Sequence, residues 1–181
     1  EKLRNIDLEG FKSITIPSLF NVKQENDMET AMDTIFEAAD IAIENGYNII
    51  ILSDKGVDKD KAPIPALLVA SGLHHHLIRK GTRMKVSIVL ESGEPREVHH
   101  FACLVGYGVN GINPYMAYEA IKELSDEKLL EYSYEDGVKR FNKACTKGIV
   151  KIMSKMGIST IQSYQGAQIF EALGISESVV N

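Results

Sequence analysis

The sequence predicts an α/β protein in which parallel βα units form a partial, TIM-barrel-like sheet with surrounding helices. Short β-branched runs alternate along the chain with longer amphipathic stretches, which is the pattern of βα units. Residues 48–52 include three consecutive isoleucines, and such unbroken apolar runs are typical of strands covered on both faces. The chain has 181 residues, whereas a complete (β/α)8 barrel usually takes about 250. We therefore expect a single domain over residues 1–181 whose sheet does not close.

The amino-terminal part of the chain predicts two short strands and one helix. The strands are expected over residues 13–16 and 19–22. Asn26 and Glu29 have the spacing of a capping box, which predicts the start of the helix. The helix carries one apolar stripe at steps of three and four residues, formed by Met28, Met32, Ile35, Ala39 and Ala42. We expect Gly46 to end it in a left-handed conformation.

The middle of the chain predicts a strand, a helix and a further strand. The first strand is expected over residues 48–52. Pro63 and Pro65 are expected to open a helix that ends at Lys80. The run over residues 85–90 predicts another buried strand.

The last part of the chain predicts helices that alternate with short strands. Pro95 is expected at the first position of a helix that runs to Gly106 or Gly108. The elements expected after it are a strand over 109–112, a helix opened by Pro114, a polar loop over 125–136, a helix over 137–156, a strand over 158–161 and a helix over 165–173. About five βα units result, and right-handed crossovers would join them into one parallel sheet.

The composition excludes several classes of function. Lys and Arg number 20 and Asp and Glu 25, a net charge of −5, whereas nucleic-acid-binding proteins present a basic face to the phosphates. No apolar run approaches the ~18 residues of a membrane span. The chain opens at Glu1 with no initiator Met and no signal peptide, which indicates a piece of a longer, cytoplasmic protein. Cys103 and Cys145 form no Cys-x-x-Cys pair, and we expect reduced thiols.

Two histidine runs are the first candidates for a metal site. His74, His75 and His76 are neighbours, and neighbours on a helix point about 100° apart, so the three do not converge on one ion. We expect one of them to pack inward and two to lie on the surface. The same objection applies to His99 and His100, one of which could serve as a buried polar anchor. No metal ligand is assigned.

The loop over residues 91–95 follows a strand, which is where α/β folds place their active loops. Together with the loop over residues 111–114 it resembles the seventh and eighth βα units of phosphate-binding, FMN-oxidoreductase-like barrels. Pro114 lacks a backbone N–H, however, and Glu91 and Glu94 bring negative charge to the first loop. A flavin phosphate would be poorly held, so no catalytic or cofactor-binding residue is assigned.

Two other features have a structural and a functional interpretation. The Gly-Tyr-Gly at residues 106–108 follows a helix rather than a strand, which favours a helix end and turn over a nucleotide-binding loop. Lys151, Ser154 and Lys155 form either a basic anion site or, as we expect, a solvated helix face.

Several motifs, in the same order along the chain, resemble the large chain of glutamate synthase. They are Leu52-Ser53-Asp54, residues 62–68 (APIPALL), residues 74–77 (HHHL), residues 89–101 (VLESGEPREVHHF), residues 111–115 (GINPY) and residues 151–160 (KIMSKMGIST). The resemblance extends from about residue 14 to residue 181. This chain is similar to the later part of the central domain of that family.

The resemblance implies a function for the parent chain and a position for this piece. The family makes two glutamates from glutamine, 2-oxoglutarate and a reductant, with ammonia passing inside the protein from an amidotransferase domain to an FMN domain. The parent family carries FMN and an iron–sulfur cluster, but the residues that hold them belong to other domains. We therefore expect no cofactor in this piece. The amidotransferase and FMN domains of the same polypeptide are its expected partners.

One position departs from the family. Its members usually read Ser-Tyr-Arg where this chain has Ser163-Tyr164-Gln165. The loss of a guanidinium removes a bidentate anion partner or an interdomain ion pair, so no contact is carried over to position 165.

Three functional hypotheses follow. The first is a non-catalytic scaffold domain of glutamate synthase that links the amidotransferase and FMN domains. The second is an autonomous small flavin- or phosphate-binding enzyme that uses the loop at Ser92-Gly93. The third is a module that binds 2-oxoglutarate through Lys151, Lys155 or Arg96. A domain that normally packs on neighbours also exposes apolar surface, so we expect a homo-oligomer.

Overall fold

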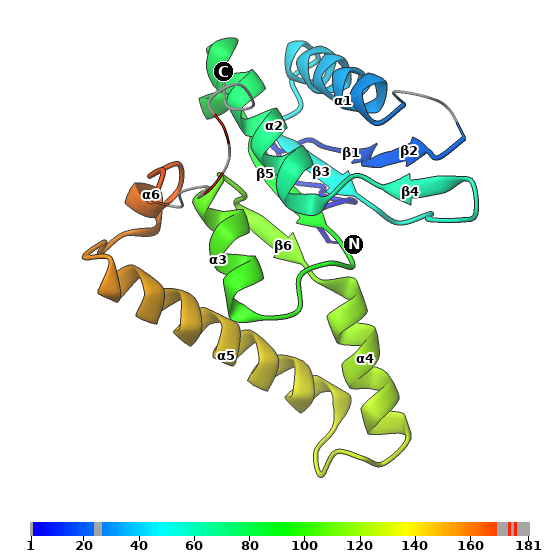
Figure 1. Ribbon diagram of the computed structural model, residues 1–181, viewed down its shortest axis with the longest axis vertical. Helices are drawn as coiled ribbons and strands as arrows, with labels where there is room; N and C mark the ends of the chain where they lie inside the picture. Colours follow the sequence, from blue (N-terminus) through cyan, green and yellow to red (C-terminus); the bar gives the residue numbers. More distant parts are fainter. Residues whose placement is uncertain (1, 24–26, 170–173, 175, 177–181) are drawn as a thin grey trace.

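The computed structural model describes residues 2–23, 27–169, 174 and 176. Its centre is a parallel sheet in which four strands follow one another in chain order (Figure 1). These strands are β1 (Ser13–Pro17), β3 (Ile49–Ser53), β5 (Ser87–Glu91) and β6 (Gly111–Asn113). Sequential parallel neighbours joined by crossover helices are the arrangement of a (β/α)8 barrel. The predicted α/β fold with a partial barrel-like sheet is therefore confirmed.

Helices and a small second sheet surround the central strands. Strands β2 (Leu19–Asn21) and β4 (Lys61–Pro63) pair antiparallel beside them. The helices are α1 (Asp27–Glu44), α2 (Ala66–Arg79), α3 (Val98–Gly106), α4 (Tyr115–Asp126), α5 (Tyr134–Lys155) and α6 (Ile161–Tyr164), with a 3-10 turn, η1, at Arg83–Lys85. None of the helices in the described part of the chain has the length and apolar character needed to span a membrane.

The core lies between the sheet and helices α1 and α2. All five residues of β3 are buried, as expected for a strand covered on both faces. The predicted apolar stripe of α1 is buried at Ile35, Ala39 and Ala42, whereas Met28 at its start is 38% exposed. Gly46 follows the helix with φ +81°, as predicted. The proposed cap at Asn26 lies outside the described residues.

Two prolines do not open helices where the sequence predicted. Pro63 ends strand β4, and α2 begins at Ala66 after Pro65. Likewise α3 begins at Val98, not at Pro95. Pro63 is thus the last residue of a strand, and Pro95 lies in the loop that follows β5. Each helix starts later, since the residue before a proline avoids the helical conformation.

The end of the chain also differs from the prediction. Residues 158–161 form no strand, because Thr160 caps α6 and accepts a hydrogen bond from the backbone of Ser163 at 3.4 Å. Residues 165–169 are not helical, and residues 170–173 lie outside the described part. The parallel sheet therefore has four strands among the described residues, where about five βα units were expected.

The turn after α6 packs against the end of α3. Tyr164 is fully buried, and its hydroxyl donates to the carbonyl of Ala102 at 3.0 Å. The Gln165 amide donates to the carbonyl of Val109 at 2.9 Å. Position 165 thus makes a contact within the chain to the turn that precedes β6.

Helices α4 and α5 form an arm that extends away from the sheet (Figure 1). Helix α5 packs on α3, where Phe101 and Phe141 meet edge to face with ring centroids 5.9 Å apart. Helix α4 has no fully buried residue and contacts mainly α5. The predicted loop over 125–136 is shorter in the structure, because α4 extends to Asp126 and α5 starts at Tyr134.

Candidate functional site

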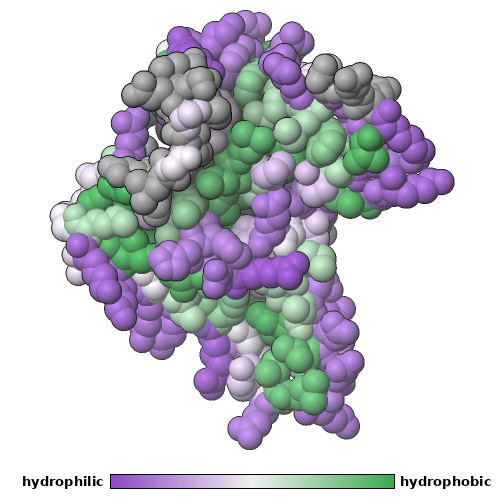
Figure 2. All heavy atoms as spheres, viewed as in Figure 1, coloured by the Kyte–Doolittle hydropathy of each residue, from purple (hydrophilic) through white to green (hydrophobic). Residues whose placement is uncertain are grey.

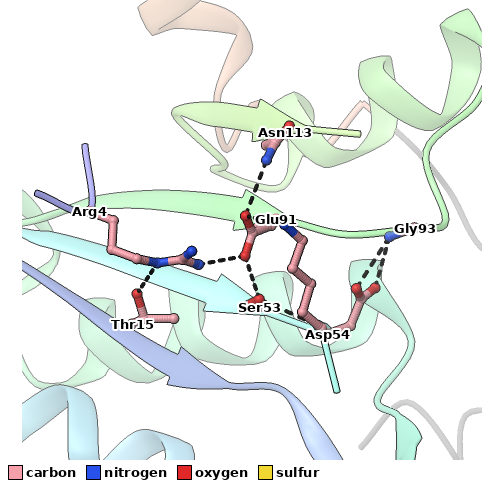
Figure 3. A network of polar contacts seen from close by, with 8 residues as sticks. Arg4, Thr15, Ser53, Asp54, Glu91, Gly93 and Asn113 are labelled. Atoms are coloured by element: carbon pink, nitrogen blue, oxygen red, sulfur yellow. Dashed lines mark hydrogen bonds and ion pairs between the residues drawn. The ribbon is translucent and has the colours of Figure 1, made fainter. Parts of the chain in front are cut away.

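The carboxyl ends of the parallel strands bring polar side chains together. Ser53, Glu91 and Asn113 end strands β3, β5 and β6 and are paired in register across the sheet. In barrel-like α/β folds this edge carries the active site, so it is the candidate site of this protein. Figure 3 shows these side chains converging at the edge, with Arg4 reaching in from the amino-terminal segment.

Glu91 is the centre of this network. Its side chain is only 6% exposed, and its two oxygens have four partners. One oxygen accepts from Arg4 and from the Ser53 hydroxyl, both at 2.6 Å. The other accepts from the Asn113 amide at 3.2 Å and lies 3.3 Å from the Lys55 ammonium. The carboxylate is thus held by two cations and two neutral donors.

These partners determine the protonation state of Glu91. Burial alone would raise its pKa, because a charged carboxylate is disfavoured away from water. The hydrogen bonds from Ser53 and Arg4 and the positive charges of Lys55 and Arg4 outweigh burial and lower the pKa to about 2. Glu91 is therefore ionised near neutral pH and does not serve as a proton donor there.

Asp54 is the centre of a second group of hydrogen bonds at the same edge of the sheet, which we call the rim. It is 5% exposed and accepts from the Ser92 hydroxyl at 2.6 Å and from the backbone of Gly93 at 3.0 Å. Burial, followed by a hydrogen bond with Asp54, raises the pKa of Tyr115 to about 12. The Lys55 ammonium lies over the Tyr115 ring, 5.0 Å from its centroid. The phenol therefore stays protonated, and the lysine lies between the Glu91 carboxylate and the Tyr115 ring.

The donors that a flavin phosphate would need are used within the chain. The backbone N–H of Gly93 binds Asp54, and that of Glu94 binds the Ser92 hydroxyl at 3.1 Å. The Glu94 carboxylate binds the first N–H of α2, at Ala66, at 3.0 Å. Pro114, at the start of α4, offers no N–H. A rim of carboxylates with engaged donors does not fit a phosphate group.

The first histidine run is divided between the core and α1. His74 is 8% exposed, and its Nδ1 accepts from Arg83 at 2.9 Å. Burial, and then the Arg83 charge, lower the pKa of His74 to about 4. His76 lies 3.0 Å from Asp40 and stacks on Phe36. One histidine packs inward as predicted, while the other two are half-buried rather than on the surface.

The second run does not contain the buried polar anchor that we considered. His99 and His100 are both exposed, and His100 accepts at Nδ1 from the backbone of Arg96 at 3.1 Å. They line a groove of about 570 Å³ between α2 and α3 that Cys103 also borders. Burial raises the pKa of the Cys103 thiol, so it is not an activated nucleophile. Cys103 and Cys145 are both free thiols.

The remaining candidates lie at the end of α3 and on α5. Residues 106–108 form the end of α3 and a turn, with Gly108 at φ +96°. Lys151, Ser154 and Lys155 are all exposed on α5. Among the residues that the structure describes, no group of three or more His, Cys, Asp or Glu side chains is arranged to hold a metal ion.

Sequence reasoning missed most of the network around Glu91. Ser53 and Asp54 follow directly on the isoleucine run, so their position after a buried strand was a usable signal, since the carboxyl ends of parallel strands meet at one edge. Arg4 had no such signal, because it lies 87 positions from its partner Glu91 and outside any strand or helix. Tyr115 was noted only within a motif.

Comparison with known proteins places the chain in one family. A family model described as the glutamate synthase central domain matches residues 1–176. The large chain of an NADPH glutamate synthase from Bacillus subtilis is 51% identical over 99% of this chain, which covers 12% of that protein. An NADH glutamate synthase from Schizosaccharomyces pombe is 40% identical over 99% of this chain and 8% of its own length. This chain thus spans a small part of its relatives.

The fold also matches solved structures of another kind. A flavocytochrome b2 mutant with benzoylformate superposes with a TM-score of 0.56 at 15% sequence identity, over 93% of this chain and 39% of that one. A match at this identity concerns the fold alone.

Proposed function

Because the chain belongs to the glutamate synthase family and matches its central domain, we propose that it is a non-catalytic scaffold. In this proposal it links the amidotransferase and FMN domains of one cytoplasmic polypeptide and keeps them at a fixed separation. The parent would make L-glutamate from L-glutamine and 2-oxoglutarate with a reductant. FMN and an iron–sulfur cluster would be held by other domains.

One observation carries the proposal. The edge of the sheet where barrel enzymes bind substrate is filled by contacts within the chain, with Glu91 bound to four partners. Asp54 accepts hydrogen bonds from the Ser92 hydroxyl and the Gly93 backbone N–H, which follow β5. A catalytic rim keeps such groups available for substrate. A rim that satisfies itself supports a role in holding structure rather than in chemistry.

The test uses the 181-residue chain and three small molecules. Titration with FMN, followed by flavin fluorescence, is expected to give no saturable binding. Incubation with glutamine is expected to release no ammonia above the uncatalysed rate. Circular dichroism and a cooperative thermal transition serve as the control for folding. Saturable FMN binding at micromolar concentration would instead support the small flavin enzyme, and ammonia release would also contradict the scaffold.

The 2-oxoglutarate hypothesis is tested by calorimetry on the same sample. Arg96 lies in the groove with His99 and His100, whereas Lys151 and Lys155 lie on α5. We expect no heat of binding for 2-oxoglutarate. Saturable heat that disappears in Arg96→Ala, or in Lys155→Ala, would replace the scaffold with a binding module and would also locate its site.

A further inference from the structure

The long helix α5 carries a row of basic side chains on its solvent face. The lysine row consists of Lys143, Lys147, Lys151 and Lys155, which follow one another at steps of four and are all exposed. Residues four apart on a helix are neighbours, and like charges at that spacing repel. No ion pair to these four lysines occurs within the part of the chain that the structure describes. The row therefore presents uncompensated positive charge along several helical turns.

An apolar hollow adjoins the row. Val150 is 59% exposed and borders a hollow of about 370 Å³ with Met153 and Ile158 near the end of α5. The face of α5 thus combines cationic groups with an unfilled apolar surface. Exposed apolar surface bordered by polar groups is what marks an interaction surface, and it distinguishes this face from a helix face that carries charges alone.

Helix α4 presents the opposite charge. Its acidic face consists of Glu119, Glu123 and Asp126, with Glu127 directly after the helix, and all four are exposed. They surround a shallow hollow of about 500 Å³ that Met116 and one basic residue, Lys122, also line. Met116, which lines this hollow, is 45% exposed. Figure 2 shows hydrophobic side chains gathered over the α4–α5 arm, with hydrophilic ones around them.

We propose that the lysine row of one copy docks on the acidic face of a second copy. Helix α5 has six basic and two acidic side chains in a chain of net charge −5, so the rest of the molecule is strongly acidic and offers the complementary charge. Two acidic faces, or two lysine rows, would repel one another. Since every copy carries both surfaces, two such contacts related by a two-fold axis close a dimer.

Burial of apolar side chains adds to the charge attraction in this contact. Exposed ion pairs contribute little on their own and are screened by salt. Val150 on one side and Met116 on the other would be removed from water by the same contact, and burial of apolar surface is the favourable term in association. We therefore expect a dimer that depends on both terms and weakens as the ionic strength rises.

The experiment is a charge swap on the 181-residue chain. One variant reverses the row, Lys147→Glu with Lys151→Glu, and the other reverses the acidic face, Glu119→Lys with Glu123→Lys. Each variant alone would pair like charges and is expected to dimerise at least about tenfold more weakly than the unmodified chain in sedimentation equilibrium. An equal mixture of the two restores opposite charges at both contacts and is expected to form heterodimers.

A matched control separates this effect from net charge. Lys59→Glu with Lys85→Glu makes the same charge change at exposed positions outside α5, and it is expected to leave the dimer intact. Thermal unfolding by circular dichroism verifies that every variant is folded. A monomeric unmodified chain at high concentration and low salt would overturn the proposal. So would a dimer that tolerates both reversals, or a mixture that fails to associate.

Discussion

At the residue scale, Glu91 shows how a buried carboxylate becomes part of the framework. A lone carboxylate at 5% exposure would be costly and would take up a proton. Here Arg4, Ser53, Lys55 and Asn113 all turn toward it, so the charged form is the stable one. The network also joins three strands to a segment near the amino terminus. Glu91 therefore stabilises the structure and does not act as a general acid.

This arrangement predicts the effect of Glu91→Gln. The substitution removes the charged acceptor of the hydrogen bonds from Arg4 and Ser53, and we expect the free energy of unfolding in urea to fall by about 2 kcal/mol. The folded-state pKa of Glu91 is lowered from about 4.5 to about 2, so its contribution is complete above pH 4.5 and is lost as the pH falls towards 2.

A control substitution and a pH series test whether the loss of stability comes from the charge of Glu91. Glu97, which is 69% exposed, is the matched position, and Glu97→Gln should change stability by less than about 0.5 kcal/mol. The stability difference between the unmodified chain and Glu91→Gln should narrow between pH 4.5 and the lowest pH at which both remain folded. A difference that is small at neutral pH, or that widens in acid, would mean that the network does not stabilise the fold.

At the scale of elements, the end of α3 lies unusually close to α2. Gly108 has φ +96°, and a Cβ there would overlap the His74 ring at Nδ1, the same nitrogen that accepts a hydrogen bond from Arg83. Arg83 also donates to the carbonyl of Gly108 at 2.6 Å and to that of Val86 at 2.7 Å. The Arg83 guanidinium thus connects the turn between α3 and β6 to α2 and η1. The lack of a side chain at Gly108 allows this turn to lie close to His74.

This junction predicts different costs for two glycine substitutions. Gly108→Ala imposes backbone strain and an overlap with His74, and we expect it to cost about 3 kcal/mol or more in urea unfolding. Gly81 also has positive φ, +71°, but a Cβ there meets nothing within 4 Å. Gly81→Ala should therefore cost only about 1–2 kcal/mol, the backbone strain by itself. Equal losses at the two positions would show that the contact with His74 carries no energy.

Local sequence patterns predicted some of these elements and failed for others. The run of isoleucines predicted β3, and the three- and four-residue steps of α1 predicted its buried stripe, because both signals are local consequences of backbone periodicity. The prolines at 63 and 95 were assigned to helix starts, since a proline suits a first helical turn and a loop equally well. Strand β4 was missed because three residues show no period. Ser53 could be placed near Glu91 because both residues end buried strands, whereas no local pattern connects Arg4, 87 positions away, with Glu91.

At the scale of the whole molecule, stability is divided unevenly. The main buried cluster draws on the sheet and on α1, α2 and α3, and within the described residues it has no member in α4 or α5. Helix α4 is held instead by the partly buried Ile121, which lies against Gly137 of α5, while α5 itself buries Cys145 and Met153. Segments with few buried contacts open at lower free energy than the core. The arm should therefore behave as a separate cooperative unit.

Native-state hydrogen exchange tests this division. In about 0.5 M salt, where charge contacts between copies are screened, we expect the amides of α4 to exchange at least about a hundredfold faster than those of β3. Ile121→Ala should accelerate exchange in α4 further, because it removes packing against α5, while the amides of Ile49–Ser53 keep their rates. Ile43→Ala, a partly buried residue packed on the core cluster, is the converse control and should accelerate β3. If Ile121→Ala accelerated both regions equally, the arm and the sheet would unfold as one unit.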